Sequence, residues 1–354
     1  MISTGQLIKD LSLLGKAFGR ASGEPGTIVQ DQDKSQEIFQ EAVEQAYLYN
    51  PWFIPSFVRF GFSAWAGALQ EEKLARWIDN YDLEEDRRKE PATIGIIMAG
   101  NIPMVGFHDL VSVLASGNRA LVKLSSSDDI LIPAVLEVLC TLNPEYRDLV
   151  IFADGPLKKF DAIIATGSNN SSRYFDYYFG KYPHIIRKNR NSAAVLDGKE
   201  SAGDLLKLAD DIFLYFGLGC RNVSKIYVPE GYDPGLIYQA AERYTFMADH
   251  NKYRNNYDYQ KSILLINRIA HYDNGFLLVK PDTSLISPIS VIHLESYQTI
   301  EQLNIDLQDR KDELQCIVSA SRDVEFSILP GTGQFPELWD YADGIDTMEF
   351  LMNL

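Results

Sequence analysis

The residues with the clearest chemical potential surround Cys220, in the sequence FGLGCRNVSKIYVP at positions 216–229. Two glycines, Gly217 and Gly219, precede the cysteine, and a β-like apolar run follows it. Cysteine thiolates form covalent intermediates with carbonyl substrates. A thiol in a glycine-containing turn is therefore a candidate nucleophile. The alternative is a small buried core residue, which is the commoner role of a single cysteine.

A second stretch, AGNIPMVGFHD, follows a short apolar run that predicts a buried strand. An asparagine at a strand end can offer its side-chain NH₂ group to a developing oxyanion. Asn101 is therefore a second candidate catalytic residue. The alternative is that Asn101 is a turn residue before Pro103.

Two further stretches lie at the ends of predicted strands, and the second of them suits a phosphate-containing cofactor. In VKLSSSD, Lys123 and Ser125 lie at the end of the next predicted strand. In IIATGSNNSSRYFD, Gly167 and Ser168 connect a predicted strand to a predicted helix. A glycine lets the backbone approach a cofactor closely, and a helix N-terminus favours anions. A solvated strand end and a simple helix cap are the alternatives, and the GxGxxG dinucleotide pattern is absent.

These stretches need a scaffold that brings strand ends together, and the apolar pattern predicts one. Short apolar runs alternate with helical periodicity, which is typical of parallel sheets covered by helices on both faces. The first set of predicted strands comprises residues 93–99, 119–125, 148–154, 161–167 and 192–198. The second set comprises residues 223–229, 262–267, 276–281, 290–295 and 314–321. With amphipathic helices before the first set, the predicted fold class is α/β with a helical N-terminal segment.

The pattern restarts after Cys220, which predicts two sheet-containing domains. We expect residues 1–205 to contain the N-terminal helices and a nucleotide-binding domain. Residues 206–322 should form a domain that carries the catalytic cysteine. The segment 323–354 is expected to return to the first domain.

Composition excludes several classes of protein. The 354 residues have a formal net charge of −16, with 46% hydrophobic and 23% charged residues. This acidic balance argues against a general nucleic-acid binder. The three cysteines at 140, 220 and 316 are too few and too widely spaced for a disulfide framework or a zinc site. No signal-peptide pattern or membrane-spanning run is seen, so we expect a cytoplasmic protein without a bound metal.

Taken together and in order, the four stretches resemble the aldehyde dehydrogenase superfamily. Within it, the chain is most similar to the LuxC-type fatty-acyl-CoA reductases. The similarity covers about residues 60–354, and its most specific segments are GNIPMVGFHDLVSVLASGN, FGLGCRNVSKIYVP, NKYRNNYDY and DGIDTMEFL. The resemblance implies two Rossmann-like parallel-sheet domains, one for the cofactor and one for catalysis.

The resemblance also implies roles for individual residues. Cys220 corresponds to the catalytic cysteine, and Asn101 to the asparagine that stabilises the oxyanion. The implied cofactor-binding residues are Lys123, Ser125, Gly167 and Ser168. The implied cofactor is NADPH, with NADH as the alternative.

The chain departs from ordinary aldehyde dehydrogenases at three places. The segment IIRKNRNS lacks the glutamate that activates water in those enzymes. Ser126 stands where NAD-selective relatives often have a glutamate, and SLISPIS lacks a second ribose-binding acid. His184 is a candidate base or a structural histidine. The basic residues Arg187, Lys188 and Arg190 predict either a solvated loop or a site for coenzyme A or a 2′-phosphate.

The resulting prediction is NADPH-dependent reduction of a fatty acyl-CoA, or of an acyl-protein thioester, to the aldehyde through an acyl-cysteine. Another thioester or acyl-phosphate reductase of the superfamily is one alternative. A cysteine acyltransferase or thioesterase and a non-catalytic relative are the others. The resemblance implies an acyl-protein synthetase as a partner and a homo-oligomer, although the sequence shows no clear dimerisation hairpin.

Overall fold

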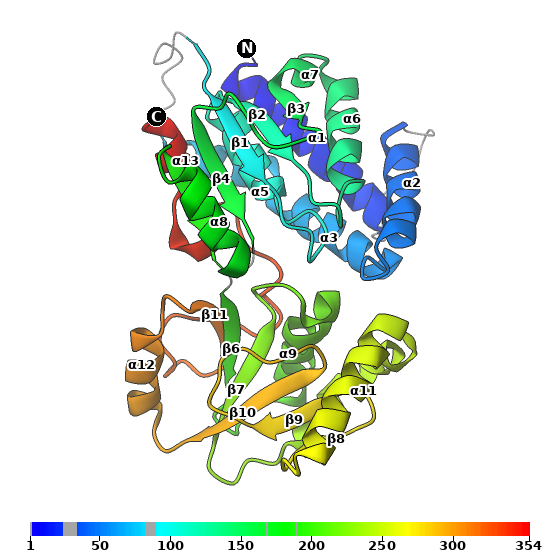
Figure 1. The fold of residues 1–354 in the computed structure, drawn as a ribbon, viewed down its shortest axis with the longest axis vertical. Coiled ribbons are helices and arrows are strands. Elements are labelled where there is room, and N and C mark those ends of the chain that lie inside the picture. Colours follow the sequence, from blue (N-terminus) through cyan, green and yellow to red (C-terminus); the bar gives the residue numbers. More distant parts are fainter. Residues whose placement is uncertain (1, 24–33, 82–89, 168, 189) are drawn as a thin grey trace. The chain divides into compact units, whose positions relative to one another are not determined.

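The computed structural model describes residues 2–23, 34–81, 90–167, 169–188 and 190–354. It forms two compact units (Figure 1). The first comprises Met1–Lys188 and Pro336–Leu354, and the second comprises Asn189–Phe335. The division differs in position from the predicted boundaries at residues 205 and 322. The run at 192–198, which we expected in the first domain, begins the sheet of the second unit.

The first unit contains a five-stranded sheet in which every strand pairs in parallel. Its order is β3-β2-β1-β4-β5, so β1 lies at the centre. The strands are β1 (Thr93–Ile97), β2 (Arg119–Lys123), β3 (Val150–Phe152), β4 (Ala162–Thr166) and β5 (His184–Arg187). Strand β3 is shorter than predicted because the residues before it form a helix. Strand β5 was not predicted.

Helices cover both faces of this sheet (Figure 1). On one face Ile94 and Ile96 of β1 join a core with helical aromatic residues such as Phe18 and Phe107. On the other face Phe160 packs against Phe179. The helices are α1 (Thr4–Ser22), α2 (Lys34–Tyr49), α3 (Pro55–Ala68), α4 (Glu71–Ile78), α5 (Phe107–Ala115), α6 (Leu131–Leu142), α7 (Tyr146–Leu149), α8 (Asn169–Phe179) and α13 (Thr347–Met352). The predicted helical N-terminal segment is thus confirmed.

The second unit is built on a seven-stranded sheet of order β12-β11-β6-β7-β10-β9-β8. Only β8 pairs in the antiparallel direction, at one edge. The strands are β6 (Asn191–Val195), β7 (Val223–Pro229), β8 (Tyr272–Asp273), β9 (Leu278–Pro281), β10 (Val291–Tyr297), β11 (Leu314–Val318) and β12 (Ser327–Ile328). The helices are α9 (Ala202–Phe213), α10 (Gly235–Ala241), α11 (Asn251–Ile266) and α12 (Ile300–Asp309). Three 3₁₀ segments, Leu214–Gly217, Glu242–Asp249 and Ala342–Gly344, complete the described elements of the chain.

The strand predicted at residues 262–267 is wrong, because this run is the last part of helix α11. His250 caps the helix by accepting a hydrogen bond from the Tyr253 backbone N–H. Tyr253, Tyr257 and Leu264 are buried at helical spacing, whereas Ile266 is 80% exposed. A continuous apolar run here reflects an unusually apolar helix end rather than a strand buried on both faces.

A buried ion pair fixes the end of β5. Arg187 Nη1 lies 2.5 Å from Asp109 Oδ2 on α5, and Arg187 Nη2 donates to Thr347 Oγ1 on α13 at 2.9 Å. All three residues are buried. Arg187 therefore does not belong to a solvated loop, and it is not available to a phosphate group. Both predictions made for the basic residues Arg187, Lys188 and Arg190, a solvated loop or a phosphate site, are therefore wrong for Arg187.

None of the described helices is long and apolar enough to cross a membrane. The described residues also contain no group of three or more His, Cys, Asp or Glu side chains that could hold a metal ion.

Because a buried arginine without its partner is strongly destabilising, we expect Asp109→Asn to lower the free energy of unfolding by about 3–5 kcal/mol. Asp258→Asn is the matched control, since Asp258 forms an exposed pair with Arg254. That change should cost less than about 0.5 kcal/mol. Urea denaturation measures both, and equal small effects would contradict the role given to the buried pair.

Candidate functional site

The first unit has a topological switch point at β1. Strand β2 lies on one side of β1 and β4 on the other, with Ile97 in register with both Lys123 and Ala165. In open α/β sheets, ligands bind at the carboxyl ends of the strands where the order reverses. The loop carrying Asn101, the end of β2 and the turn at Gly167 all leave from this edge. The structure therefore brings together the predicted residues of the first unit that it describes.

The loops at this edge are fastened to one another. A Cβ atom at Gly100 would lie 2.5 Å from Ser125 Oγ, so only glycine allows the two loops to approach so closely. Asn50 Nδ2 donates to the Ser127 carbonyl at 3.1 Å. The Met104 backbone N–H donates to Asp128 Oδ2 at 2.8 Å, and Met104 has a left-handed φ of 57°. The loops are therefore held in one arrangement before any ligand binds.

Asp128 was not among the predicted site residues. Its burial raises the pKa of its carboxyl group to about 7, although the Met104 backbone N–H opposes that shift. In the sequence, only the position of Asp128 directly after VKLSSS indicates that it could belong to the site. Asp128 positions the loop that carries Asn101 and is not itself exposed to a ligand.

The individual candidates differ in accessibility. Asn101 is exposed, whereas Lys123 and Ser125 are partly buried. Ser125 Oγ accepts a hydrogen bond from the Ser127 backbone N–H at 3.2 Å. Gly167 directly follows β4, and Ser168 lies outside the described residues. These positions leave a cation, a hydroxyl group and a glycine turn at one sheet edge.

Thr166 adds a feature that sequence reasoning missed. Its Oγ1 atom is buried at the end of β4 and has no hydrogen-bond partner among the described residues. Buried hydroxyl groups usually have a partner. An unsatisfied hydroxyl at the switch point, next to Gly167, fits a polar ligand such as the ribose or phosphate of a dinucleotide.

His184 does not lie at this edge. It begins β5, opposite Ile163 near the start of β4, and therefore sits toward the amino ends of the strands. Its Nδ1 atom contacts the Tyr182 carbonyl at 2.8 Å. The structural interpretation of His184 is the one that this position favours.

The second unit presents Cys220 on an unusual turn. The turn connects helix α9 to strand β7, and the Cys220 residue is exposed. Tyr215, Phe216 and Gly217 have consecutive left-handed φ angles of 54°, 57° and 73°. Such a conformation costs about 1–3 kcal/mol at each non-glycine residue and persists only when the surroundings enforce it. Both aromatic residues are buried, so packing enforces it here.

Asn222 is the residue that holds this turn together, and sequence reasoning missed it. Its Oδ1 atom accepts from the Gly219 backbone N–H at 2.8 Å. Its Nδ2 atom donates to the carbonyls of Asp211 at 3.0 Å and Leu214 at 2.9 Å. The end of α9 and the residue before Cys220 are thus tied to one buried side chain.

Asp211 secures a second segment beside the turn. Its carboxylate accepts from the backbone N–H groups of Gly331 at 2.6 Å and Gly333 at 2.9 Å. Burial raises the pKa of Asp211 to about 6, against the effect of these two donors. A Cβ atom at Gly333 would lie 2.8 Å from Asp211 Oδ1 and 3.4 Å from the Arg221 carbonyl. The glycine lets this segment pack closely against the residue that follows Cys220.

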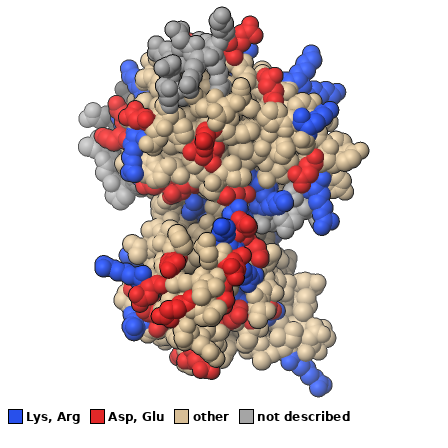
Figure 2. Space-filling model, turned by 90° about the vertical axis from the view of Figure 1, so that its left-hand side faces the viewer, with Lys and Arg blue, Asp and Glu red and all other residues tan. Residues whose placement is uncertain are grey.

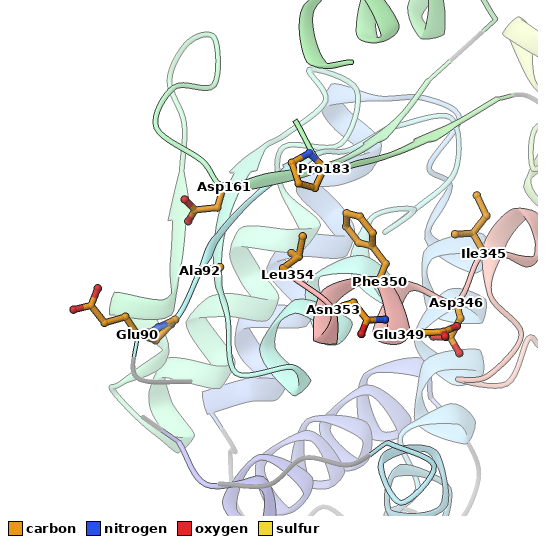
Figure 3. A pocket seen from close by; sticks show the side chains of 11 residues that line it. Glu90, Ala92, Asp161, Pro183, Ile345, Asp346, Glu349, Phe350, Asn353 and Leu354 are labelled. Atoms are coloured by element: carbon orange, nitrogen blue, oxygen red, sulfur yellow. Dashed lines mark hydrogen bonds between the residues drawn. The ribbon is translucent and has the colours of Figure 1, made fainter. Parts of the chain in front are cut away.

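A groove of about 930 Å³ lies elsewhere in the first unit (Figure 3). Ala92, Asp161 and Pro183 in its wall directly precede β1, β4 and β5, so the groove lies at the amino ends of the strands. Phe350 and Glu349 of α13 complete much of its lining. It contains none of the predicted site residues.

Among the residues that the structure describes, the face drawn in Figure 2 shows no continuous basic patch of the kind that would bind a polyanion. Acidic and basic side chains are interspersed over its described residues.

A comparison with protein families adds an independent finding about this part of the chain. Residues 69–234 match the family described as acyl-CoA reductase (LuxC). This segment, called the LuxC segment below, is similar to that family. The predicted resemblance is thereby confirmed, and so is the enzyme class, an acyl-CoA reductase. The LuxC segment includes Asn101, Lys123, Ser125, Gly167 and Cys220, whereas Cys316 lies outside it.

Solved structures show the same fold across nearly the whole chain. An oxidoreductase from Marinobacter aquaeolei has a TM-score of 0.66 at 13% identity, covering 95% of this chain and 79% of its own. Aldehyde dehydrogenase 21 from Physcomitrella patens, solved with succinate, has a TM-score of 0.62 at 13% identity, with 98% and 84% covered. An indole-3-acetaldehyde dehydrogenase from P. syringae, solved with NAD+ and IAA, has a TM-score of 0.58 at 11% identity, with 92% and 77% covered. No curated protein matches the chain.

These likenesses confirm the aldehyde dehydrogenase-like α/β fold. Together with the LuxC match, they make the chain a reductase or dehydrogenase that acts on acyl or aldehyde groups.

The raised pKa of Asp128 predicts a pH dependence of stability. Between about pH 4 and pH 7 the folded protein keeps a proton that the unfolded chain releases, so the free energy of unfolding should decrease as the pH rises through this window. Asp128→Asn should flatten this part of the profile and stabilise the protein at pH 8. The exposed neighbour Asp129 supplies the control, Asp129→Asn. A wild-type slope retained in the Asp128 variant would show that another group causes the dependence.

Removing the Asn222 amide should release the Cys220 turn. Because several buried backbone groups lose their partner, we expect Asn222→Ala to cost about 1–3 kcal/mol of unfolding free energy. Asn256→Ala removes an exposed amide that bonds only within α11, and it should change stability by less than about 0.5 kcal/mol. Urea unfolding of the two variants compares them directly. A cost no larger than that of the control would exclude Asn222 as the anchor.

Proposed function

We propose that the protein reduces a fatty acyl-CoA, or an acyl group carried as a thioester on a protein, to the aldehyde with NADPH. The observation that carries the proposal is the Cys220 turn. It presents an exposed cysteine in a strained, fully anchored backbone within the LuxC segment. A cysteine with only a packing role would not require an anchored turn that exposes it.

The first step is acyl transfer to the enzyme. The Cys220 thiolate attacks the thioester carbonyl carbon, a new sulfur–carbon bond forms, and an electron pair moves to the carbonyl oxygen. We assign stabilisation of that oxyanion to the Asn101 amide and to the Cys220 backbone N–H. The oxyanion then collapses and expels the thiolate of coenzyme A. The acyl group remains on Cys220 as a thioester.

The second step is reduction of that acyl-cysteine. When bound at the first unit, NADPH would provide the hydride that the thioester carbonyl carbon accepts. Cys220 then serves as the leaving group, because its bond to the reduced carbon breaks and the aldehyde is released. The thiolate is regenerated for the next acyl group.

The switch point of the first unit is the proposed cofactor site. Lys123 and Ser125 would contact the adenosine ribose, while Gly167 and Ser168 would approach the nicotinamide half. The unsatisfied Thr166 hydroxyl and the close loop packing support this assignment. The P. syringae neighbour was solved with NAD+, which supports a nicotinamide cofactor here.

The phosphorylated cofactor is favoured by a single position. Ser126 is exposed and neutral, three residues after Lys123. A carboxylate there would repel a 2′-phosphate and would bond the 2′-hydroxyl of NADH instead. A neutral serine does not repel the 2′-phosphate, so this position permits NADPH, which we assign as the cofactor with NADH as the alternative.

The absence of an acid from the segment IIRKNRNS supports reduction over hydrolysis. A carboxylate that activated water would cleave the acyl-cysteine to a fatty acid before reduction. The sequence between His184 and Ser192 has no Asp or Glu. The acyl-cysteine would therefore survive long enough to be reduced.

The acyl donor and the assembly follow from the same proposal. A protein-bound thioester would come from an acyl-protein synthetase, which we propose as a partner. We also propose a homo-oligomer, in keeping with the superfamily that the chain resembles.

A single-turnover experiment with a fatty acyl-CoA and NADPH tests the proposal. Wild-type protein should oxidise NADPH and release coenzyme A, whereas Cys220→Ala should lose at least about 10³-fold in rate because the covalent route is closed. Absorbance of the reduced nicotinamide and a thiol reagent follow the two products. Cys140→Ala, which removes a thiol from helix α6, is the matched control and should retain the wild-type rate.

The products separate the alternatives. Release of coenzyme A without NADPH oxidation would indicate a cysteine acyltransferase or thioesterase. An unchanged rate in Cys220→Ala would refute the proposed nucleophile. If neither product forms with several chain lengths or with an acylated partner protein, the reductase proposal fails.

A further inference from the structure

A second cysteine lies beside the Cys220 turn, outside the LuxC segment. Cys316 is on strand β11, next to β6, which carries Ser192. The pairing of β6 is irregular on both sides, toward β11 and toward β7. These irregularities let the Ser192 side chain reach two partners on neighbouring elements.

Ser192 connects the second cysteine to the first. Its Oγ atom lies 2.9 Å from the Cys220 carbonyl oxygen and 3.0 Å from Cys316 Sγ. Ser192 is fully buried. A carbonyl oxygen can only accept, so the single hydroxyl proton of Ser192 goes to Cys220. The contact with sulfur is then completed only if the Cys316 thiol donates its proton to Ser192 Oγ.

Cys316 is suited to remain a donor. Burial raises the pKa of its thiol to about 11, so it stays protonated near neutral pH. A nearby Cys220 acts in the same direction, while Arg221 and the hydrogen bond with Ser192 oppose the shift. A protonated thiol in this environment is a poor nucleophile, which leaves Cys316 a role through Ser192.

The backbone before Cys220 is fixed independently. The Asn222 backbone N–H donates to the Gly219 carbonyl at 3.0 Å, which orients the peptide group between Gly219 and Cys220. The bond from Ser192 orients the peptide group between Cys220 and Arg221. With both flanking peptide groups held, the direction in which the Cys220 side chain leaves the backbone is set.

We propose that Cys316 is a positioning residue that aims the Cys220 nucleophile through Ser192. The Cys316 S–H group donates to Ser192 Oγ, and the Ser192 O–H group donates to the Cys220 carbonyl. Without the thiol, Ser192 Oγ loses the donor that helps to hold it in place, and its hydrogen bond to the Cys220 carbonyl is less firmly oriented. The inference rests on the proposed function, in which Cys220 carries the acyl group.

Four variants test the relay with the same acyl-CoA and NADPH assay. Cys316→Ala removes the donor, and Ser192→Ala removes the link. Each should lower kcat about tenfold, with KM within about twofold, because misorientation affects the chemical step more than substrate binding. Cys316→Ser keeps a donor of similar size and should restore kcat to within about threefold of wild type. The double variant Ser192→Ala/Cys316→Ala should be no slower than Ser192→Ala alone, since both changes break one chain of hydrogen bonds.

Two further measurements distinguish positioning from structural damage. The rate at which iodoacetamide alkylates Cys220 should fall in parallel with kcat across the variants. The urea denaturation midpoints of the same variants should not follow the order of their kcat values. Cys140→Ala is again the control and should leave both rates unchanged.

Each outcome decides the matter. Wild-type kcat in Cys316→Ala, with Cys220→Ala inactive, would overturn the relay and leave the proposed function intact. An equal loss in Cys316→Ala and Cys316→Ser would also overturn it, because sulfur rather than a hydrogen-bond donor would then be required. Full activity of Cys220→Ala would overturn the proposed function and the relay with it.

Discussion

A guanidinium group cannot be buried without a partner, and much of the first unit follows from the way this chain meets that requirement. Arg187 is buried at the end of β5 and is bonded to Asp109 on α5 and Thr347 on α13. These residues are 78 and 160 positions from Arg187 along the chain. The ion pair therefore joins an edge strand, the helix that follows the Asn101 loop, and the last helix. Helix α5 cannot shift without breaking it, so the loop between β1 and α5 has a fixed end.

The two units prepare their loops for chemistry in different ways. In the first unit, regular parallel strands bring the loops to one edge, and a glycine lets them touch. In the second, the turn before Cys220 adopts an unfavourable backbone conformation that a buried asparagine and buried aromatic rings enforce. The first arrangement suits a long cofactor that contacts several strand ends. The second suits a single atom that must be aimed at a carbonyl group.

Much of the fold could be predicted because the relevant signals are local. The strands at 93–99, 119–125 and 223–229 are continuous apolar runs bounded by polar residues, and both sheets follow from them. The candidate residues Asn101 and Cys220 were found from short motifs at the ends of such runs. Their proposed roles derive from the family resemblance and from the chemistry of their side chains.

The features that were missed depend on contacts between distant residues. Strand β5 is short and contains a charged residue that is buried only because Asp109 neutralises it. Residues 262–267 look like a strand, yet the tyrosines earlier in α11 set a helical face that includes Leu264. Asn222 and Ser192 are ordinary polar residues in the sequence. Only the fold shows that each is buried beside the Cys220 turn.

The first unit is discontinuous, and this affects the order in which the chain can fold during synthesis. Its core includes Leu338, Met348 and Leu351, which are translated after the entire second unit. The second unit is one uninterrupted stretch, so all of its residues are translated before Pro336. Residues 1–188 therefore have an uncovered apolar surface until residues 336–354 have been translated. A nascent chain of this protein would leave that surface uncovered while residues 189–335 are translated.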